Sequence, residues 1–135
     1  MLPKFAILTL LLTTPCIFGQ DLRLNGRIIG KVESGGDIRL DGKIVGKFES
    51  NGYIRVRGKL TGKIESNGYI RKDGRLVGKL ENNGDVRVDG RIVGKVEDNG
   101  DIRKNGRIIG QAKGVEKSYA AALFFFGFFE GVLNK

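Results

Sequence analysis

Five glutamates recur at one position of a repeated phrase, and carboxylates are the side chains of this sequence best suited to acid–base chemistry. They are Glu33, Glu49, Glu65, Glu81 and Glu97. A glycosidase needs two carboxylates in different environments, whereas equivalent positions of a repeat provide similar ones, so we expect these glutamates to be cross-strand partners of Arg or Lys. The chain has no histidine, the commonest general base and metal ligand. We therefore predict a protein that is not an enzyme.

The segment 97–101, Glu-Asp-Asn-Gly-Asp, has the oxygen-rich composition of a calcium loop. Asp and Asn also hydrogen-bond locally in turns, where Gly adopts a positive φ angle. The equivalent segment 49–53 lacks the additional carboxylates. The pattern therefore favours a turn, and we predict neither a metal site nor a cofactor.

Basic side chains outnumber acidic ones, with 24 Lys and Arg against 15 Asp and Glu and a formal net charge of +9. One interpretation is a solvated face balanced by carboxylates. The other is a face that binds an anionic envelope polymer such as lipopolysaccharide or an acidic glycan. Nucleic acid fits less well, because only Tyr53 and Tyr69 within the repeats could stack on bases. The candidate anion-binding residues are Arg39, Lys43, Lys47, Arg55, Lys59, Lys63, Arg71 and Arg87.

A 16-residue phrase must position these side chains, and it is repeated in five complete copies and one partial copy that begin at positions 22, 38, 54, 70, 86 and 102. Within a copy, apolar residues alternate with charged ones, which is the period of a strand. Each copy also has two turn sequences that end in Gly, such as Asp41-Gly42 and Asn51-Gly52. The predicted fold is therefore an all-β array of tandem hairpin repeats with one hydrophobic C-terminal α-helix.

The alternation also predicts the turns, because paired residues of an antiparallel ladder face the same side of the sheet. A three-residue loop at 40–42 pairs Ile38 with Ile44 and places both in the core, and a similar loop at 50–52 connects successive copies. Residue 40 is then a loop position. This placement accounts for the variation among its equivalents, Leu40, Val56, Lys72, Val88 and Lys104.

One glycine recurs in the interior of the longer strand of each copy. Glycine weakens a strand, so its recurrence predicts a sharp bend or the close approach of another segment on the apolar face. These bend glycines are Gly30, Gly46, Gly62, Gly78, Gly94 and Gly110.

The hairpins could form an open ribbon or a closed, barrel-like ring. We favour the ring, because an open array would expose strand edges at both ends. Residues 21–113 resemble the secreted repeat proteins called β-flower proteins, whose hairpins radiate about a central axis. The second copy matches their repeat unit at Ile38, Arg39, Gly42, Gly46, Glu49, Asn51 and Gly52. The resemblance implies a fold, and it carries no activity.

The first nineteen residues have the pattern of a secretory signal peptide. Lys4 supplies the positive charge, residues 5–14 form a short apolar stretch, and Gly19 is small enough to precede the cleavage site. A lipoprotein signal with Cys16 as the acylated residue is the alternative. Cleavage after Gly19 would leave 23 basic and 15 acidic residues, a net charge of +8, and no cysteine. We expect an exported protein that is periplasmic, at the cell surface or secreted.

The repeat domain is expected to span residues 20–113, and residues 114–135 form an apolar tail. Three consecutive alanines favour a helix, which we expect at residues 119–133, about 22 Å long at 1.5 Å per residue. Such a helix must be buried in the centre of its own ring, against other copies in a homo-oligomer, or at a membrane interface. The phenylalanines to be buried are Phe124, Phe125, Phe126, Phe128 and Phe129.

These features together predict a non-catalytic structural or interaction module of the cell envelope or periplasm. The excess of basic residues supports an alternative, a module that binds polyanions such as acidic glycan or lipopolysaccharide. The apolar tail supports another, a membrane-associated protein anchored by its C-terminal helix.

Overall fold

The computed structural model describes residues 20–129, which form twelve antiparallel strands and one helix. The predicted signal peptide and Cys16 lie outside these residues. The shorter, first strands of the hairpins are β1 (Asp21–Leu24), β3 (Asp37–Leu40), β5 (Tyr53–Val56), β7 (Tyr69–Lys72), β9 (Asp85–Val88) and β11 (Asp101–Lys104). The second strands are β2 (Arg27–Val32), β4 (Lys43–Phe48), β6 (Lys59–Ile64), β8 (Arg75–Leu80), β10 (Arg91–Val96) and β12 (Arg107–Gln111).

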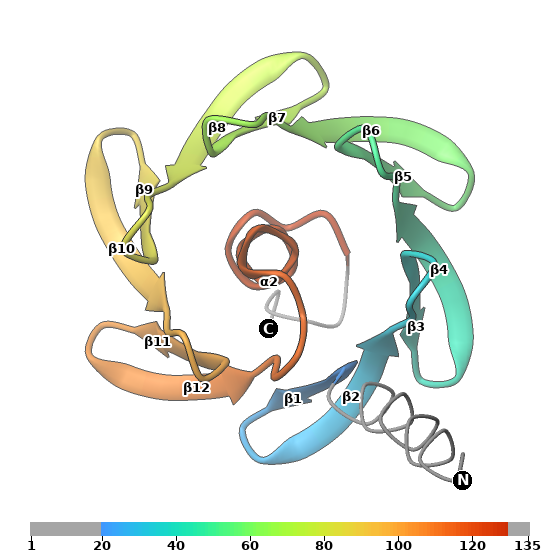
Figure 1. Ribbon diagram of the computed structural model, residues 1–135, viewed down its shortest axis with the longest axis horizontal. Helices are drawn as coiled ribbons and strands as arrows, with labels where there is room; N and C mark the ends of the chain where they lie inside the picture. The colour runs from blue at the N-terminus through green and yellow to red at the C-terminus, as the bar shows by residue number, and fades with distance from the viewer. Residues whose placement is uncertain (1–19, 130–135) are drawn as a thin grey trace, which may run out of the picture.

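The six hairpins form a closed ring, as the sequence predicts. Each strand pairs with its two neighbours in the sequence, and β1 pairs with β12 through Arg23 opposite Gln111 and Leu24 opposite Gly110. Figure 1 shows the hairpins as petals around a central helix, α2 (Lys117–Phe125). Closure leaves no strand edge unpaired in the ring.

The turn within each hairpin differs from the prediction. In the second hairpin Leu40 pairs with Lys43, so the loop consists of only Asp41 and Gly42. Their φ angles are 52° and 81°, as a type I′ turn requires. The predicted three-residue loop at 40–42 is therefore wrong, and residue 40 with its equivalents belongs to a strand.

A β-bulge explains why the two-residue turn is compatible with a buried face. Arg39 pairs with Ile44, but Ile38 pairs with Gly46, so Val45 is an additional residue in the longer strand. The bulge shifts the alternation by one residue. Ile44, predicted to be in the core opposite Ile38, instead faces outward and is 52% exposed.

The loops that connect one hairpin to the next follow the prediction. Phe48 pairs with Ile54, Glu49 after the end of β4 is hydrogen-bonded to Tyr53, and the remaining three-residue loop ends at Gly52 with a φ of 97°. The backbone N–H of Gly52 donates to the carbonyl oxygen of Glu49 at 2.9 Å, and the N–H of Glu49 donates to that of Tyr53 at 2.8 Å. This geometry holds Phe48 and Ile54 on the inner face, where both are buried.

The core of the ring is built from one fully buried residue of each first strand together with the central tail. The six strand residues are Leu22, Ile38, Ile54, Ile70, Val86 and Ile102. Helix α2 is shorter than the predicted helix at 119–133, because it ends at Phe125 and the chain turns at Gly127 with a φ of 68°. Glu130 and the rest of the tail lie outside the described residues. Among residues 20–129, no helix has the length and apolar character needed to span a membrane.

Candidate functional site

The C-terminal tail fills the centre of the ring by contacting the bend glycines. A Cβ atom added to Gly46 would lie 2.5 Å from Cε1 of Phe129, which is far closer than two carbon atoms can approach. Phe124, Phe125, Phe126 and Phe128 contact Gly110, Gly94, Gly78 and Gly62 in the same way. Five phenylalanines therefore follow five hairpins in reverse chain order. Of the three burials left open by the sequence, the structure has the first, in which the tail packs inside its own ring.

The position predicted to be a loop residue makes contacts inside the ring in two of the hairpins. At Gly30 the atoms nearest to a built Cβ belong to Arg39 and Leu40, and the side chain of Leu40 comes within 2.8 Å. Two hairpins further, Lys72 donates from Nζ to the carbonyl oxygens of Phe126, at 3.4 Å, and Gly127, at 3.2 Å. Carbonyl groups at the C-terminal end of a helix have no hydrogen-bond donor within the helix. Lys72 supplies a donor to two carbonyl groups directly after the end of α2.

Arginine and glutamate form the same ion pair in successive repeats, as predicted for cross-strand partners. Arg39 Nε lies 2.6 Å from Glu33 Oε2, and Arg71 Nε lies 2.7 Å from Glu65 Oε2. The pairs Arg55–Glu49, Arg87–Glu81 and Arg103–Glu97 are equivalent. In each of these hairpins Nη1 of the arginine also donates to the carbonyl oxygen of the glycine at the turn. The arginines and glutamates of the repeat thus hold the hairpins in shape.

The candidate anion-binding residues do not all share a face. Lys47 pairs with Arg55, and Lys63 with Arg71, so these four project from the outer face, like Arg39 and Arg87. Lys43 pairs with Leu40, and Lys59 with Val56, which places both lysines on the other side of the hairpin. The prediction that Lys43 shares the face of Arg39 and Lys47 is therefore wrong, for the same reason as the turn.

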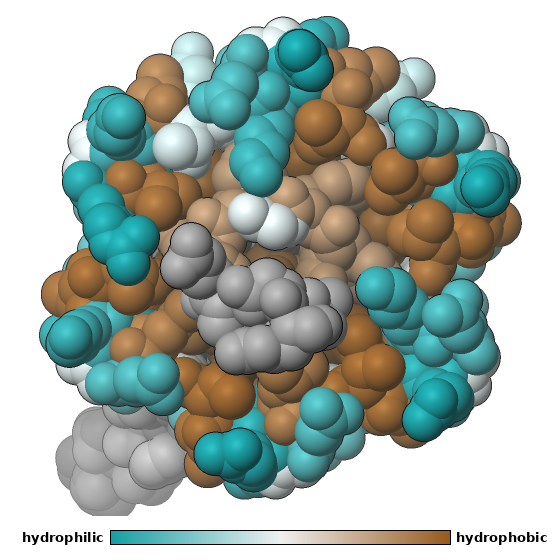
Figure 2. Space-filling view, turned by 180° about the vertical axis from the view of Figure 1, so that it is seen from behind, coloured by the Kyte–Doolittle hydropathy of each residue, from teal (hydrophilic) through white to brown (hydrophobic). Residues whose placement is uncertain are grey.

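Each hairpin also exposes one large aliphatic side chain on its outer face, at 48% to 55% of its full area. These are Ile28, Ile44, Leu60, Leu76, Ile92 and Ile108. Figure 2 shows apolar surface between hydrophilic ridges around the rim of the molecule. Large apolar side chains that recur on a surface indicate a contact surface more readily than a single exposed one does.

A groove lies between neighbouring hairpins on the outer face, and it recurs at equivalent residues. One groove of about 420 Å³ is lined by Tyr69, Leu76, Lys79 and Arg87, among others. Another, of about 260 Å³, has Asp85, Ile92, Lys95 and Arg103 at the positions 16 residues further along. The wall is thus formed by an aliphatic side chain from one hairpin and an arginine from the next.

Two repeats differ from the others at the first residue of the short strand. Tyr53 and Tyr69 occupy the position that is Asp in β1, β3, β9 and β11. Lys63 pairs with Tyr53, and its Nζ lies 4.9 Å from the centre of the tyrosine ring. Lys79 and Tyr69 have the same arrangement, also at 4.9 Å. From the sequence, these tyrosines are interpreted only as stacking platforms for bases, but each of them replaces a carboxylate of the other copies.

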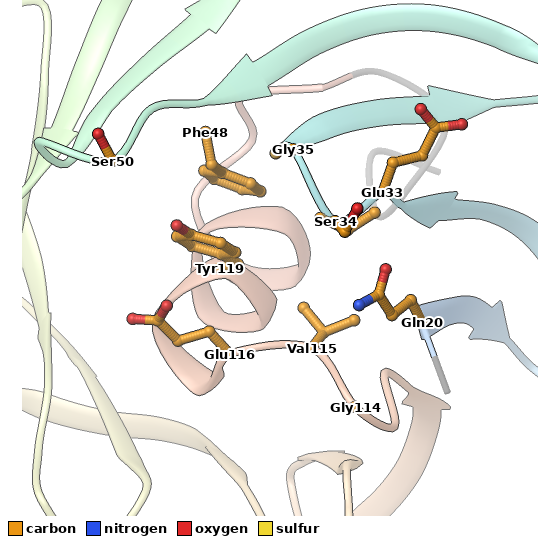
Figure 3. Close-up of a pocket in the computed structure, with 12 residues that line it drawn as sticks. Gln20, Glu33, Ser34, Gly35, Phe48, Ser50, Gly114, Val115, Glu116 and Tyr119 are labelled. Atoms are coloured by element: carbon orange, nitrogen blue, oxygen red, sulfur yellow. The ribbon is translucent and has the colours of Figure 1, made fainter. Parts of the chain in front are cut away.

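A smaller pocket of about 220 Å³ opens where α2 enters the ring (Figure 3). The rings of Phe48 and Tyr119 stack there with their centroids 4.1 Å apart and their planes 4° apart. Burial raises the pKa of Tyr119, and the nearby Glu116 carboxylate raises it further. A second cleft of about 490 Å³ separates the first turn of the helix from the loops at 50–52 and 66–68.

The opposite side of the helix start is held by an ion pair between Lys117 and Asp98. The hydrogen bond and the charge of Lys117 hold the pKa of the Asp98 carboxyl below its usual range. Asn99 Oδ1 accepts a hydrogen bond from the backbone N–H of Asp101 at 3.0 Å, which is the local turn chemistry expected for segment 97–101. Within residues 20–129, no three acidic or cysteine side chains come together as metal ligands.

Comparison of the chain with models of protein families, with curated protein sequences and with solved structures found no match. The candidate site consists of the repeated outer grooves, whose walls are formed by charged and aliphatic side chains.

Proposed function

We propose that the protein is a non-catalytic interaction scaffold of the cell envelope or periplasm, with a β-flower architecture. The observation that carries this proposal is the repetition of one outer groove at positions 16 residues apart, as at Leu76 and Ile92. The tail occupies the interior of the ring, so the outer face offers the largest regular surface to a partner. Location in the envelope rests on the signal-like pattern of residues 1–19.

Sedimentation with purified envelope fragments would test the proposal. We expect the mature chain to sediment with the fragments in a saturable manner. The double variant Leu76→Ser with Ile92→Ser should weaken this binding at least about tenfold, because two aliphatic side chains that the partner would cover are lost. The matched control exchanges the aliphatic groups, Leu76→Ile with Ile92→Leu, and should bind like the wild type. Both residues are about half exposed, so neither pair of changes should unfold the ring.

Two results would overturn the scaffold proposal. One is equal sedimentation of the serine variant and the wild type. The other is turnover of a substrate in a broad hydrolase panel that is abolished by a single change such as Glu81→Gln. The second result would assign the repeated carboxylates a catalytic role in place of their ion pairs with arginine.

A second candidate function, polyanion binding, is favoured by the charge of the chain. After the predicted cleavage the net charge would be +8. A basic protein attracts polyanions through its summed field even without a specific site. This candidate is compatible with the scaffold, because the same outer grooves contain lysine.

A further inference from the structure

The excess positive charge is concentrated in one third of the ring. Residues 53–84, which form β5 to β8, contain eight Lys and Arg against three Asp and Glu, a net charge of +5. Residues 21–52 contain six against five, and residues 85–116 contain seven against six, so each of these equally long segments has a net charge of only +1. The two hairpins between β5 and β8 are therefore the electrostatically distinct part of the ring.

The two tyrosines are part of the cause of this concentration. At the start of β5 and β7, Tyr53 and Tyr69 stand where four other hairpins have aspartate. The lysines opposite them, Lys63 and Lys79, consequently have a neutral ring as their cross-strand partner instead of a carboxylate. By contrast, Lys95 in the next hairpin pairs with Asp85.

The lysines of these grooves also have fewer polar partners than the arginines. Arg71 and Arg87 are bound to Glu65 and Glu81 and to the turn carbonyls. None of the six ion pairs found within residues 20–129 includes Lys63 or Lys79. Their ammonium groups are held near the tyrosine rings and remain able to bind an anion.

We propose that the outer face of β5 to β8 binds an acidic polysaccharide, an inference that rests on the proposed role as an interaction scaffold. Lys63 and Lys79 would bind carboxylates of the polymer, and half-exposed Leu60 and Leu76 would contact the C–H faces of its sugar rings. The same arrangement recurs one hairpin apart, so a polymer that carries a charge on every sugar contacts both hairpins at once. A single-stranded nucleic acid fits less well, because each lysine already covers one face of the tyrosine on which a base would stack.

Binding of polygalacturonate to the mature chain, measured by calorimetry at low ionic strength, tests this inference. We expect binding that weakens steeply as salt approaches about 0.15 M, where charges are screened beyond about 8 Å. Lys63→Gln with Lys79→Gln should weaken it at least about tenfold. Tyr53→Asp with Tyr69→Asp should have a similar effect, and it introduces only the residue that other hairpins already have at this position.

The matched control is Lys31→Gln with Lys95→Gln, which removes the same charge from equivalent positions opposite Asp21 and Asp85. It should change the affinity by no more than about twofold, because each of these lysines faces an aspartate that already offsets its charge toward an anionic polymer. An equal loss in both lysine pairs would overturn the site, since it would show attraction by net charge alone. Tighter binding of a single-stranded DNA oligonucleotide than of polygalacturonate would overturn the ligand class.

Failure of this inference can be distinguished from failure of the scaffold proposal. If polygalacturonate does not bind but the chain still sediments with envelope fragments through Leu76 and Ile92, the glycan site is wrong and the scaffold stands. If neither occurs, both proposals fail.

Discussion

Gly62 and Phe128 are in direct contact across the interior of the ring, although they are far apart in the sequence. A Cβ atom on Gly62 would lie 2.5 Å from Cε1 of Phe128 and 2.6 Å from the carbonyl oxygen of Arg71. The glycine therefore allows two close approaches, one by the neighbouring strand and one by the tail. This double constraint recurs at five of the six bend glycines, and at Gly30 the second close approach is made by the side chain of Leu40.

Substitution of Gly62 by alanine should therefore destabilise the protein by about 2 to 3 kcal/mol, because an additional methyl group must displace both a ring and a backbone carbonyl. The free energy of unfolding would be measured by denaturant titration. Gly35→Ala is the control, since nothing lies within 4 Å of a Cβ at that position, and it should change stability by less than about 0.5 kcal/mol. Equal tolerance of the two changes would show that the phenylalanine does not occupy this place in solution.

Removal of a buried phenylalanine should be more costly. Phe124 is fully buried against Gly110, so Phe124→Ala should lower stability by about 3 to 5 kcal/mol. Deletion of residues 115–135 would remove all five such rings, and we expect the remaining chain to unfold or aggregate, as circular dichroism and light scattering would detect. A soluble, folded ring after this deletion would instead favour a tail that serves as an anchor.

Lys72 should contribute to stability more than a lysine at a surface strand normally does. Lys72→Met keeps most of the aliphatic side chain but removes the donor to the carbonyl oxygens of Phe126 and Gly127, at an expected cost of about 1 to 2 kcal/mol. The control is Lys104→Met at the equivalent position, where the side chain is exposed. A similar effect of both changes on the thermal midpoint would mean that charge, and not contact with the tail, is responsible.

Much of this architecture could be predicted because the repeat constrains it. The 16-residue period, the turn sequences and the recurring glycines are visible in the sequence, and together they predict a closed ring with glycines that allow a bend or the close approach of another segment. The register could not be obtained from alternation alone, because a bulge at Val45 reverses the parity between Ile44 and Gly46. The third hairpin has the same bulge with Thr61 as the additional residue, so two adjacent apolar residues do not by themselves identify it.

The candidate site was predicted less well, because it depends on differences between copies and not on what they share. Arg39 and Arg55 are among the predicted anion ligands, but each forms an ion pair with a glutamate. Tyr53 and Tyr69 differ from the aspartates of the other copies, and that difference determines which lysines lack an acidic partner. The role of Lys72 depends on where the tail turns, which no feature of the repeat determines.

Stability at high pH should depend on Tyr119. Its folded pKa is raised by burial and by Glu116, above an unfolded value of about 10. A raised pKa means that the folded state holds the proton more tightly, so this contribution to stability is complete below pH 10 and is lost as pH rises through the folded pKa. Unfolding free energies measured between about pH 8 and pH 11 should therefore decrease, because the stack of Tyr119 on Phe48 cannot accommodate a phenolate without cost.

Tyr119→Phe should keep the stack and reduce this alkaline loss of stability, since phenylalanine has no proton to release. Tyr69→Phe is the control, because Tyr69 lies on the outer face beside Lys79, away from the stack. The difference in phenolate absorbance between the wild type and Tyr119→Phe isolates the titration of Tyr119, which should occur above pH 10. If that difference titrates below pH 10, or if Tyr119→Phe leaves the alkaline decrease unchanged, the ring of Tyr119 is not buried against Phe48 and the helix start is open to solvent.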